Sequence, residues 1–305
     1  YNGAWSGGGG SSYSNVTPDV DLEWTDNRTG AAISLGRHGK VTITYLTVTD
    51  PIPTSDITFS ILKTKYINSG ITSASGHSNL SAGYAFTSHT FTNCGKTGRN
   101  GPTLSECISS YGSSGNWWND TDNFNVIGAS GVNGIQVWTV PGTGDYDIDA
   151  YGASGGDSTS TTYRGGHGAR MKGRFTLTQG DKYMILIGQE GGGGATNTLG
   201  SSGGGGTFFV EGDDYTSVTS SELLIAAGGG GGAGRGATGG SGQGGVVVPS
   251  SSTSGGSNGT YGVGGGGGLL SNGIGAGYSP AASPYPPGTG GYGFKQGGQG
   301  GLAGL

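Results

Sequence analysis

Apolar and polar residues alternate in several short stretches of the chain. Residues 41–45 and 57–61 each carry an apolar residue at every second position, with Thr or Ser between them. In residues 145–151, Tyr146 and Ile148 face one way while the aspartates between them face the other. Successive side chains of a β-strand point to opposite faces, so this pattern predicts strands with one buried face.

Other segments predict strands by their apolar content and by the turns beside them. Residues 134–141 end in a Pro-Gly turn, and residues 169–177 and 182–187 lie on either side of a Gln-Gly-Asp turn. A further strand near residues 89–92 leads into a turn-rich loop. Many short strands separated by turns indicate a β-sandwich or jelly roll.

From residue 188 onwards, blocks of glycine alternate with short apolar segments. We expect the apolar segments to be further strands of the sandwich; they are residues 207–210, 223–225, 246–248 and 269–270. A glycine block cannot hold one conformation by itself, because glycine loses more backbone entropy on folding than any other residue. The blocks are therefore either disordered or fixed by contacts with the rest of the protein.

Composition leaves both alternatives open. The 305 residues include 73 glycines and 10 prolines, a content typical of disordered chains, and they contain no strict Gly-X-Y repeat of the collagen kind. The apolar segments, however, need burial, which disordered linkers do not require. We expect ordered polyglycine II helices, extended with three residues per turn, whose N–H and C=O groups bond to neighbouring helices.

The chain is thus expected to be mainly β and to contain two regions. Residues 1–85 are expected to form a small N-terminal β-module or connector. Residues 86–305 are expected to form a β-sandwich of the jelly-roll kind with a packed bundle of polyglycine II helices. The glycine-rich insertions lie mainly in residues 188–305.

Charge narrows the range of partners. Charged residues make up only 11% of the chain and the net charge is −5, which argues against a nucleic-acid partner. No apolar run is long enough to cross a bilayer, so we expect no membrane insertion. Ser, Thr, Gly and Asn dominate the polar residues, which is typical of extracellular or virion β-proteins.

The two cysteines, Cys94 and Cys107, are close in sequence and flanked by turn residues. An even count at this spacing favours one local disulfide, and two free thiols in a reducing compartment are the alternative. No histidine lies at ligand spacing from them, so a structural zinc site is not expected.

No catalytic signature stands out. The four histidines, at positions 38, 77, 89 and 167, are scattered, and no Gly-x-Ser-x-Gly elbow accompanies them. Residues 234–239 match Gly-x-Gly-x-x-Gly, a match expected by chance in glycine-rich sequence. We expect a protein that is not an enzyme and needs no cofactor.

Two polar motifs are of low specificity. Asp145, Asp147 and Asp149 share one strand face, which suggests either a cation site or, as we favour, a solvated face. Five Asn-x-Ser/Thr sequons begin at Asn15, Asn27, Asn79, Asn119 and Asn258. Several sequons are expected by chance in a chain so rich in Ser and Thr, so they do not fix the compartment.

Aromatic residues near the C-terminus lie in Gly/Pro-rich loops. They are Tyr261, Tyr278, Tyr285, Tyr292 and Phe294. Aromatic side chains on loops supply contact area at low entropy cost, which makes these residues candidate surface contacts. The alternative is that they cap and shield the glycine bundle.

A series of linked motifs gives the chain a resemblance to known proteins. The motifs lie at residues 91–95, 101–103, 134–141, 146–153, 185–189 and 224–228, with Cys107 and Tyr111 between them. In this order they resemble the glycine-rich extracellular region of the anaplastic lymphoma kinase and leukocyte tyrosine kinase receptors. They are also similar to domains of phage tail-fibre and structural proteins, including those of cyanophages. The resemblance covers roughly residues 86–305 and implies a tumour-necrosis-factor-like sandwich with packed polyglycine helices and, in the receptors, cytokine binding.

Two classes of function follow from these expectations. The first is a virion-surface or tail-fibre protein that binds a host cell-surface glycan or protein, assembled as a homo-oligomer for which a trimer is a natural fibre geometry. The second is the ligand-binding extracellular region of a receptor-like protein. A self-assembling filament or matrix protein is a further alternative. The expected location is the virion surface or the extracellular space.

Overall fold

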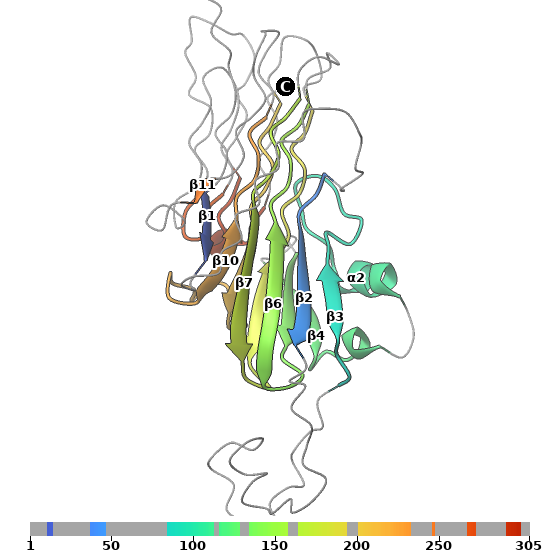
Figure 1. Cartoon of the computed structure of the whole chain (residues 1–305). Helices are drawn as coiled ribbons and strands as arrows, with labels where there is room; N and C mark the ends of the chain where they lie inside the picture. Colours follow the sequence, from blue (N-terminus) through green and yellow to red (C-terminus); the bar gives the residue numbers. More distant parts are fainter. Residues whose placement is uncertain are drawn as a thin grey trace, which may run out of the picture.

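The computed structural model describes eight parts of the chain and the backbone of two short strands. These are residues 37–46, 84–112, 116–128, 134–157, 164–193, 201–232, 267–272 and 291–299, with strand backbones at 11–14 and 246–247. The described residues form a mainly β fold with two sheets and little helix (Figure 1). The second predicted strand, at 57–61, lies outside them.

The smaller sheet has four antiparallel strands. Their order is β3 (Ser88–Phe91), β2 (Lys40–Leu46), β6 (Gly144–Tyr151) and β7 (Arg170–Leu177). In β6, alternate residues are buried from Tyr146 onwards, as the sequence pattern predicts. β2 precedes the domain boundary expected at residue 85, yet it is an inner strand of this sheet. The boundary itself stays a prediction.

The larger sheet has seven strands. Their order is β11 (Val246–Val247), β1 (Ser11–Ser14), β10 (Leu223–Ala227), β9 (Thr207–Glu211), β8 (Lys182–Leu186), β5 (Ile135–Thr139) and β4 (Phe124–Ile127). Neighbours are antiparallel except β1 and β11, which are parallel. Three of the apolar segments between glycine blocks are thus strands, as predicted. The fourth, residues 269–270, is a bend whose Leu269 is buried.

The main core lies between the two sheets. Its largest fully buried side chains include Trp138 of β5, Tyr146 of β6 and Phe91 of β3. The rings of Trp138 and Tyr146 meet edge-on at 5.7 Å between centroids. Burial of an aromatic or large aliphatic side chain stabilises the fold by about 1.5–3 kcal/mol, so this cluster holds the sheets together.

A second apolar cluster covers the outer face of the seven-stranded sheet. It contains Met184 of β8 and Phe208 of β9, which pack with Leu269 and Phe294 from the C-terminal segments. The central strands of this sheet are therefore buried on both faces. This explains why their sequences are continuous apolar runs and do not alternate.

One helix was not predicted from the apolar pattern. α2 (Leu104–Tyr111) begins with a capping box, in which the Thr103 side chain accepts from the Glu106 N–H and the Glu106 carboxylate accepts from the Thr103 N–H at 2.7 Å. Such a box satisfies two otherwise unpaired N–H groups of the first turn. A 3₁₀ turn, η2 (Trp117–Asn119), follows it. The Thr-x-x-Glu motif was the available signal, but eight residues are too few for a clear helical period.

A disulfide ties α2 to the end of β3. Cys94 and Cys107 are joined with an S–S distance of 2.07 Å, and both are buried. Cys94 has a φ of 51°, in the left-handed region that non-glycine residues seldom adopt. The disulfide holds this turn against the helix.

Replacing both cysteines with alanine tests the contribution of this bond. A disulfide that closes a loop of this size limits the unfolded chain, so the double variant should lose about 3 kcal/mol of unfolding free energy. Urea denaturation followed by tryptophan fluorescence measures the difference. An unchanged unfolding midpoint would mean that the bond contributes little.

Candidate functional site

Six extended segments gather beyond one end of the sheets, and we call them the glycine bundle. They are residues 37–39, 152–157, 164–169, 188–193, 201–206 and 228–232. Each segment lies next to a strand, with at most one residue between them, and three belong to strands of each sheet. Figure 1 shows them running side by side from the ends of the arrows towards the label C. The bundle is therefore where the strands of both sheets continue together.

Backbone hydrogen bonds join the segments directly. Gly155 donates to the carbonyl of Gly166 at 2.9 Å, Gly166 donates to Gly231 at 2.8 Å, and Gly204 donates to Gly230 at 2.8 Å. These bonds satisfy peptide groups that have no side chains nearby to serve them.

The partners of segment 152–157 recur at every third residue. Donors three residues apart bond to the same neighbouring segment: Gly152 and Gly155 to 164–169, and Ala153 and Gly156 to 201–206. Between them, Ser154 donates to the carbonyl of Arg37 at 2.9 Å. A β-strand would return to the same side at every second residue, so these segments are not paired as a sheet is paired.

Glycine is required in the bundle by lack of space. A Cβ atom on Gly155 would lie within 3 Å of the Gly231 backbone, and one on Gly230 would meet the Gly166 backbone equally closely. None of the described bundle glycines has a positive φ, so left-handed backbone is not the reason for glycine here. The absence of side chains is what allows the segments to bond to one another.

A group of charged residues joins four of the segments, and we call it the Asp157 clasp. The Asp157 carboxylate accepts from Arg37 Nη1 at 2.8 Å, from Arg164 Nη1 at 2.7 Å and from the Gly165 N–H at 2.9 Å. Arg37 Nε also lies 2.9 Å from a carboxylate oxygen of Glu190. Partial burial raises the pKa of Asp157, but the Gly165 N–H and the two guanidinium groups outweigh it and hold the pKa below its usual value.

The three aspartates of β6 face outward and take cross-strand partners on β7. Asp149 pairs with Arg170 and Asp147 with Arg174, each through two hydrogen bonds, while Asp145 accepts from the Thr176 hydroxyl. The Arg174 hydrogen bond is the main cause that lowers the pKa of Asp147. No cluster of three potential metal ligands occurs in the described parts of the chain. The arrangement is a solvated face of paired charges.

One predicted contact residue stands at the junction of the sheets and the bundle. Tyr292 is 42% exposed, the only large hydrophobic side chain exposed among the described residues. The guanidinium carbon of Arg99 lies 5.8 Å from its ring centroid, within reach of a cation–π interaction. Arg99 donates to Gln299 at 3.1 Å, and Gln299 donates to Asn100 at 2.7 Å. We call these four residues the Tyr292 surface.

The Tyr292 surface is held from two sides. The Tyr292 N–H donates to the Gln299 carbonyl at 2.7 Å, and Gln189 of the bundle donates to the Asn100 carbonyl at 3.0 Å. A residue just beyond β8 therefore fixes the loop after β3 on which Arg99 lies. No local sequence pattern indicates that Arg99 lies beside Tyr292, because the two residues are far apart in the chain.

The other predicted contact residues do not join this surface. Phe294 is fully buried and packs on Phe208 at 5.8 Å between ring centroids, so its prediction as a surface contact is wrong. The apolar outer face of the seven-stranded sheet needs a cover, and Phe294 supplies part of it. Tyr261, Tyr278 and Tyr285 lie outside the described residues.

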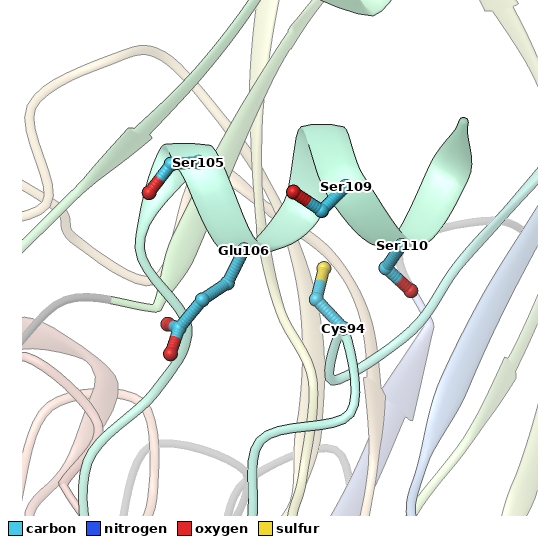
Figure 2. A pocket seen from close by; sticks show the side chains of 5 residues that line it. All are labelled: Cys94, Ser105, Glu106, Ser109 and Ser110. Carbon is cyan, nitrogen blue, oxygen red and sulfur yellow. The ribbon is translucent and has the colours of Figure 1, made fainter. Parts of the chain in front are cut away.

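A shallow depression lies beside the disulfide. It measures about 460 Å³ and is lined by Cys94, Ser105, Glu106, Ser109 and Ser110. Figure 2 shows the Glu106 carboxylate at one end and three serines along α2. Lys96 lies 2.7 Å from this carboxylate and, with the helix cap, lowers the pKa of Glu106 to about 2. Since the carboxylate is engaged in this way, it is poorly suited to activate a serine.

The three described histidines lie in different surroundings. His38 Nδ1 accepts from the Glu190 N–H at 3.0 Å, and His167 is exposed. His89 packs among aromatic rings, with Tyr111 at 4.6 Å and Trp117 at 5.1 Å between centroids, and burial lowers its pKa to about 4. His77 lies outside the described residues.

Comparison with known proteins favours one class of function. No protein-family model matches the chain. The chain is 38% identical over 102 residues to the leukocyte tyrosine kinase receptor of Mus musculus, which is 33% of the chain and 11% of the receptor. The chain thus spans a small part of the length of that relative. The similarity supports the receptor-like interpretation, and neither it nor the structure supports a phage tail fibre or the virion surface. No helix in the described parts could cross a membrane.

Gly155→Ala tests whether the bundle depends on close backbone contact. The added methyl group has to displace the Gly231 backbone, so the variant should lose about 1–3 kcal/mol of unfolding free energy. Urea denaturation measures the loss, and exchange of the Gly166 amide, which donates to the Gly231 carbonyl, should become faster. The matched control is Gly142→Ala in an open turn, where nothing lies within 4 Å of the added Cβ.

Asp157→Asn tests the clasp. Loss of the Asp157 carboxylate should lower the free energy of unfolding by about 1–3 kcal/mol at pH 7, because two guanidinium groups lose their anionic partner. The pKa of Asp157 is lower in the folded state than in the unfolded state. Its contribution to stability is therefore fully present above the unfolded-state pKa of about 4, and it is lost as the pH falls through the folded-state pKa. Denaturation at several pH values should show the two proteins converging below about pH 4. A difference that does not change with pH would contradict the electrostatic account.

Proposed function

We propose that this chain is an extracellular, ligand-binding, glycine-rich region of a receptor-like protein and that it is not an enzyme. The observation that carries the proposal is the 38% identity to a receptor over 102 residues. The partner is a protein ligand, and the Tyr292 surface is the part of the described structure that contacts it.

In this proposal the glycine bundle is a set of polyglycine II helices. Three features support it: the three-residue recurrence of hydrogen-bond partners, the bonds between segments, and the absence of positive φ angles at the bundle glycines. Each is expected of extended helices with three residues per turn that lack internal hydrogen bonds. We further propose that the two sheets form a sandwich of the jelly-roll, tumour-necrosis-factor-like kind, as the resemblance implies.

The Tyr292 surface has the properties of a contact site on a stiff frame. Tyr and Arg are enriched among residues that dominate protein–protein binding energy. Tyr292 and Arg99 lie on loops that are fixed to each other and, through Gln189, to the bundle. A surface that is ordered before binding loses less entropy when a partner docks.

Two features support an extracellular location. A disulfide such as Cys94–Cys107 persists in oxidising surroundings and is rare in the cytosol. The sequence similarity to a receptor agrees with that location.

The proposal is tested by binding of the cytokines of the anaplastic lymphoma kinase and leukocyte tyrosine kinase receptors to the immobilised chain, measured by surface plasmon resonance. Tyr292→Ala should weaken binding at least about tenfold, equivalent to about 1.4 kcal/mol, because it removes the exposed ring and its cation–π contact with Arg99. Circular dichroism should show an unchanged fold for this variant, because Tyr292 belongs to neither of the two apolar clusters.

The matched control is Lys182→Ala. Lys182 begins β8 at the end opposite Gln189 and makes an exposed ion pair with Asp213, so its loss should leave the affinity unchanged. Absence of binding by the folded chain would overturn the proposed function. Equal affinity of the wild type and Tyr292→Ala would overturn the assignment of the surface.

A further inference from the structure

One Asn-x-Ser/Thr sequon lies within the described residues, at Asn119-Asp120-Thr121. Asn119 is the last residue of η2, and Thr121 lies in the turn that follows. Both residues are exposed. The position +1 is not proline, so the sequon meets the requirement for N-glycosylation.

The local structure turns Asn119 towards solvent. Its two predecessors are anchored: Trp117 stacks on Tyr84 at 4.9 Å between ring centroids, and Trp118 Nε1 donates to the Gly112 carbonyl at 2.8 Å. Both indoles are half-buried, so they fix the 3₁₀ turn to the sandwich and leave its third residue outside.

The Asn119 side chain is not engaged elsewhere in the described structure. Its backbone N–H donates to the Asn116 carbonyl, but its amide group has no hydrogen-bond partner among the described residues. The neighbouring carboxylate of Asp120 is occupied, since it accepts from the Asp122 N–H at 3.0 Å and from Asn123 Nδ2 at 3.1 Å. The nearest acidic group is thus directed into its own turn and does not compete for the amide.

From this geometry we propose that Asn119 carries an N-linked oligosaccharide. The proposal deepens the proposed extracellular function and rests on it, since the modification is made in the secretory pathway. Asn119 Nδ2 bonds to C1 of the first sugar while the bond from C1 to a lipid-linked pyrophosphate breaks. The lipid pyrophosphate leaves, and the proton lost by the amide neutralises it, so no oxidant or reductant is needed.

The glycan would project from the side of the sandwich that carries α2. Trp118 bonds to the residue that ends α2, so η2 packs beside that helix. Figure 1 shows α2 at the flank of the sheets, away from the glycine segments that extend beyond them. Asn119 takes no part in the hydrogen bonds that form the Tyr292 surface, which join Arg99, Asn100, Tyr292 and Gln299 to one another and to Gln189.

The test is expression of the full chain with a foreign secretion signal in eukaryotic cells. The secreted protein is treated with peptide N-glycosidase in ¹⁸O water, and the peptide that contains Asn119 is identified by mass spectrometry. We expect this peptide to carry the ¹⁸O-labelled aspartate in most molecules. Recovery of the peptide with unmodified Asn119 from folded, secreted protein would overturn the proposal.

Variants separate the sequon from the fold around it. Asn119→Gln and Thr121→Ala should abolish modification at this site, whereas Thr121→Ser should retain it. The matched control is Asn116→Gln, three residues earlier on the same turn, which lies outside any sequon and should leave the glycan in place. Modification that persists in Thr121→Ala would contradict the sequon as its cause.

The outcome is independent of the binding experiment. The foreign signal delivers the chain to the transferase wherever the natural protein resides, and cytokine binding is measured separately on Asn119→Gln. If Asn119 is unmodified and cytokine binding still depends on Tyr292, only the glycosylation proposal is overturned. If Asn119 is modified but the chain does not bind the cytokines, only the proposed ligand-binding function is overturned.

Discussion

The structure depends on peptide groups that approach one another with no side chain between them. In the glycine bundle, hydrogen bonds between neighbouring backbones take the place that side-chain packing has in the sandwich. These backbone hydrogen bonds can form only where the contact positions lack a Cβ atom, as at Gly155 and Gly230. Because each segment continues a strand, order in the bundle and order in the two sheets support each other. This coupling is a reason for a glycine-rich chain to fold at all, since glycine is entropically costly to fix.

Charge supplies the specificity that glycine lacks. One glycine segment offers the same N–H and C=O groups as another, so backbone bonding alone does not choose among arrangements. The Asp157 clasp joins four particular segments through side chains that differ in sign and length. Buried polar groups have such a role in some other systems, where they fix register at some cost in stability.

The sequence predicted much of the sandwich, because its signals are local. Strict alternation located β6 and its buried face, and short apolar runs located β9 and β10. What escaped prediction depends on contacts between distant residues. The clasp joins Arg37 to Asp157 across 120 positions, and no local pattern indicates such a pair. Phe294 was expected at the surface because its glycine-rich neighbours suggested an exposed loop, whereas the outer face of the larger sheet buries it.

The three-residue recurrence of hydrogen-bond partners has a consequence for how such chains change in evolution. If three residues are inserted into or deleted from a bundle segment, every later N–H still faces the same neighbouring segment. A change of one or two residues turns each later N–H towards a different segment. A change of three residues therefore preserves the hydrogen-bond pattern of the bundle, whereas other changes of length break it. Homologues aligned through these segments should differ by gaps that are multiples of three amino acids, a phase that ordinary surface loops do not keep.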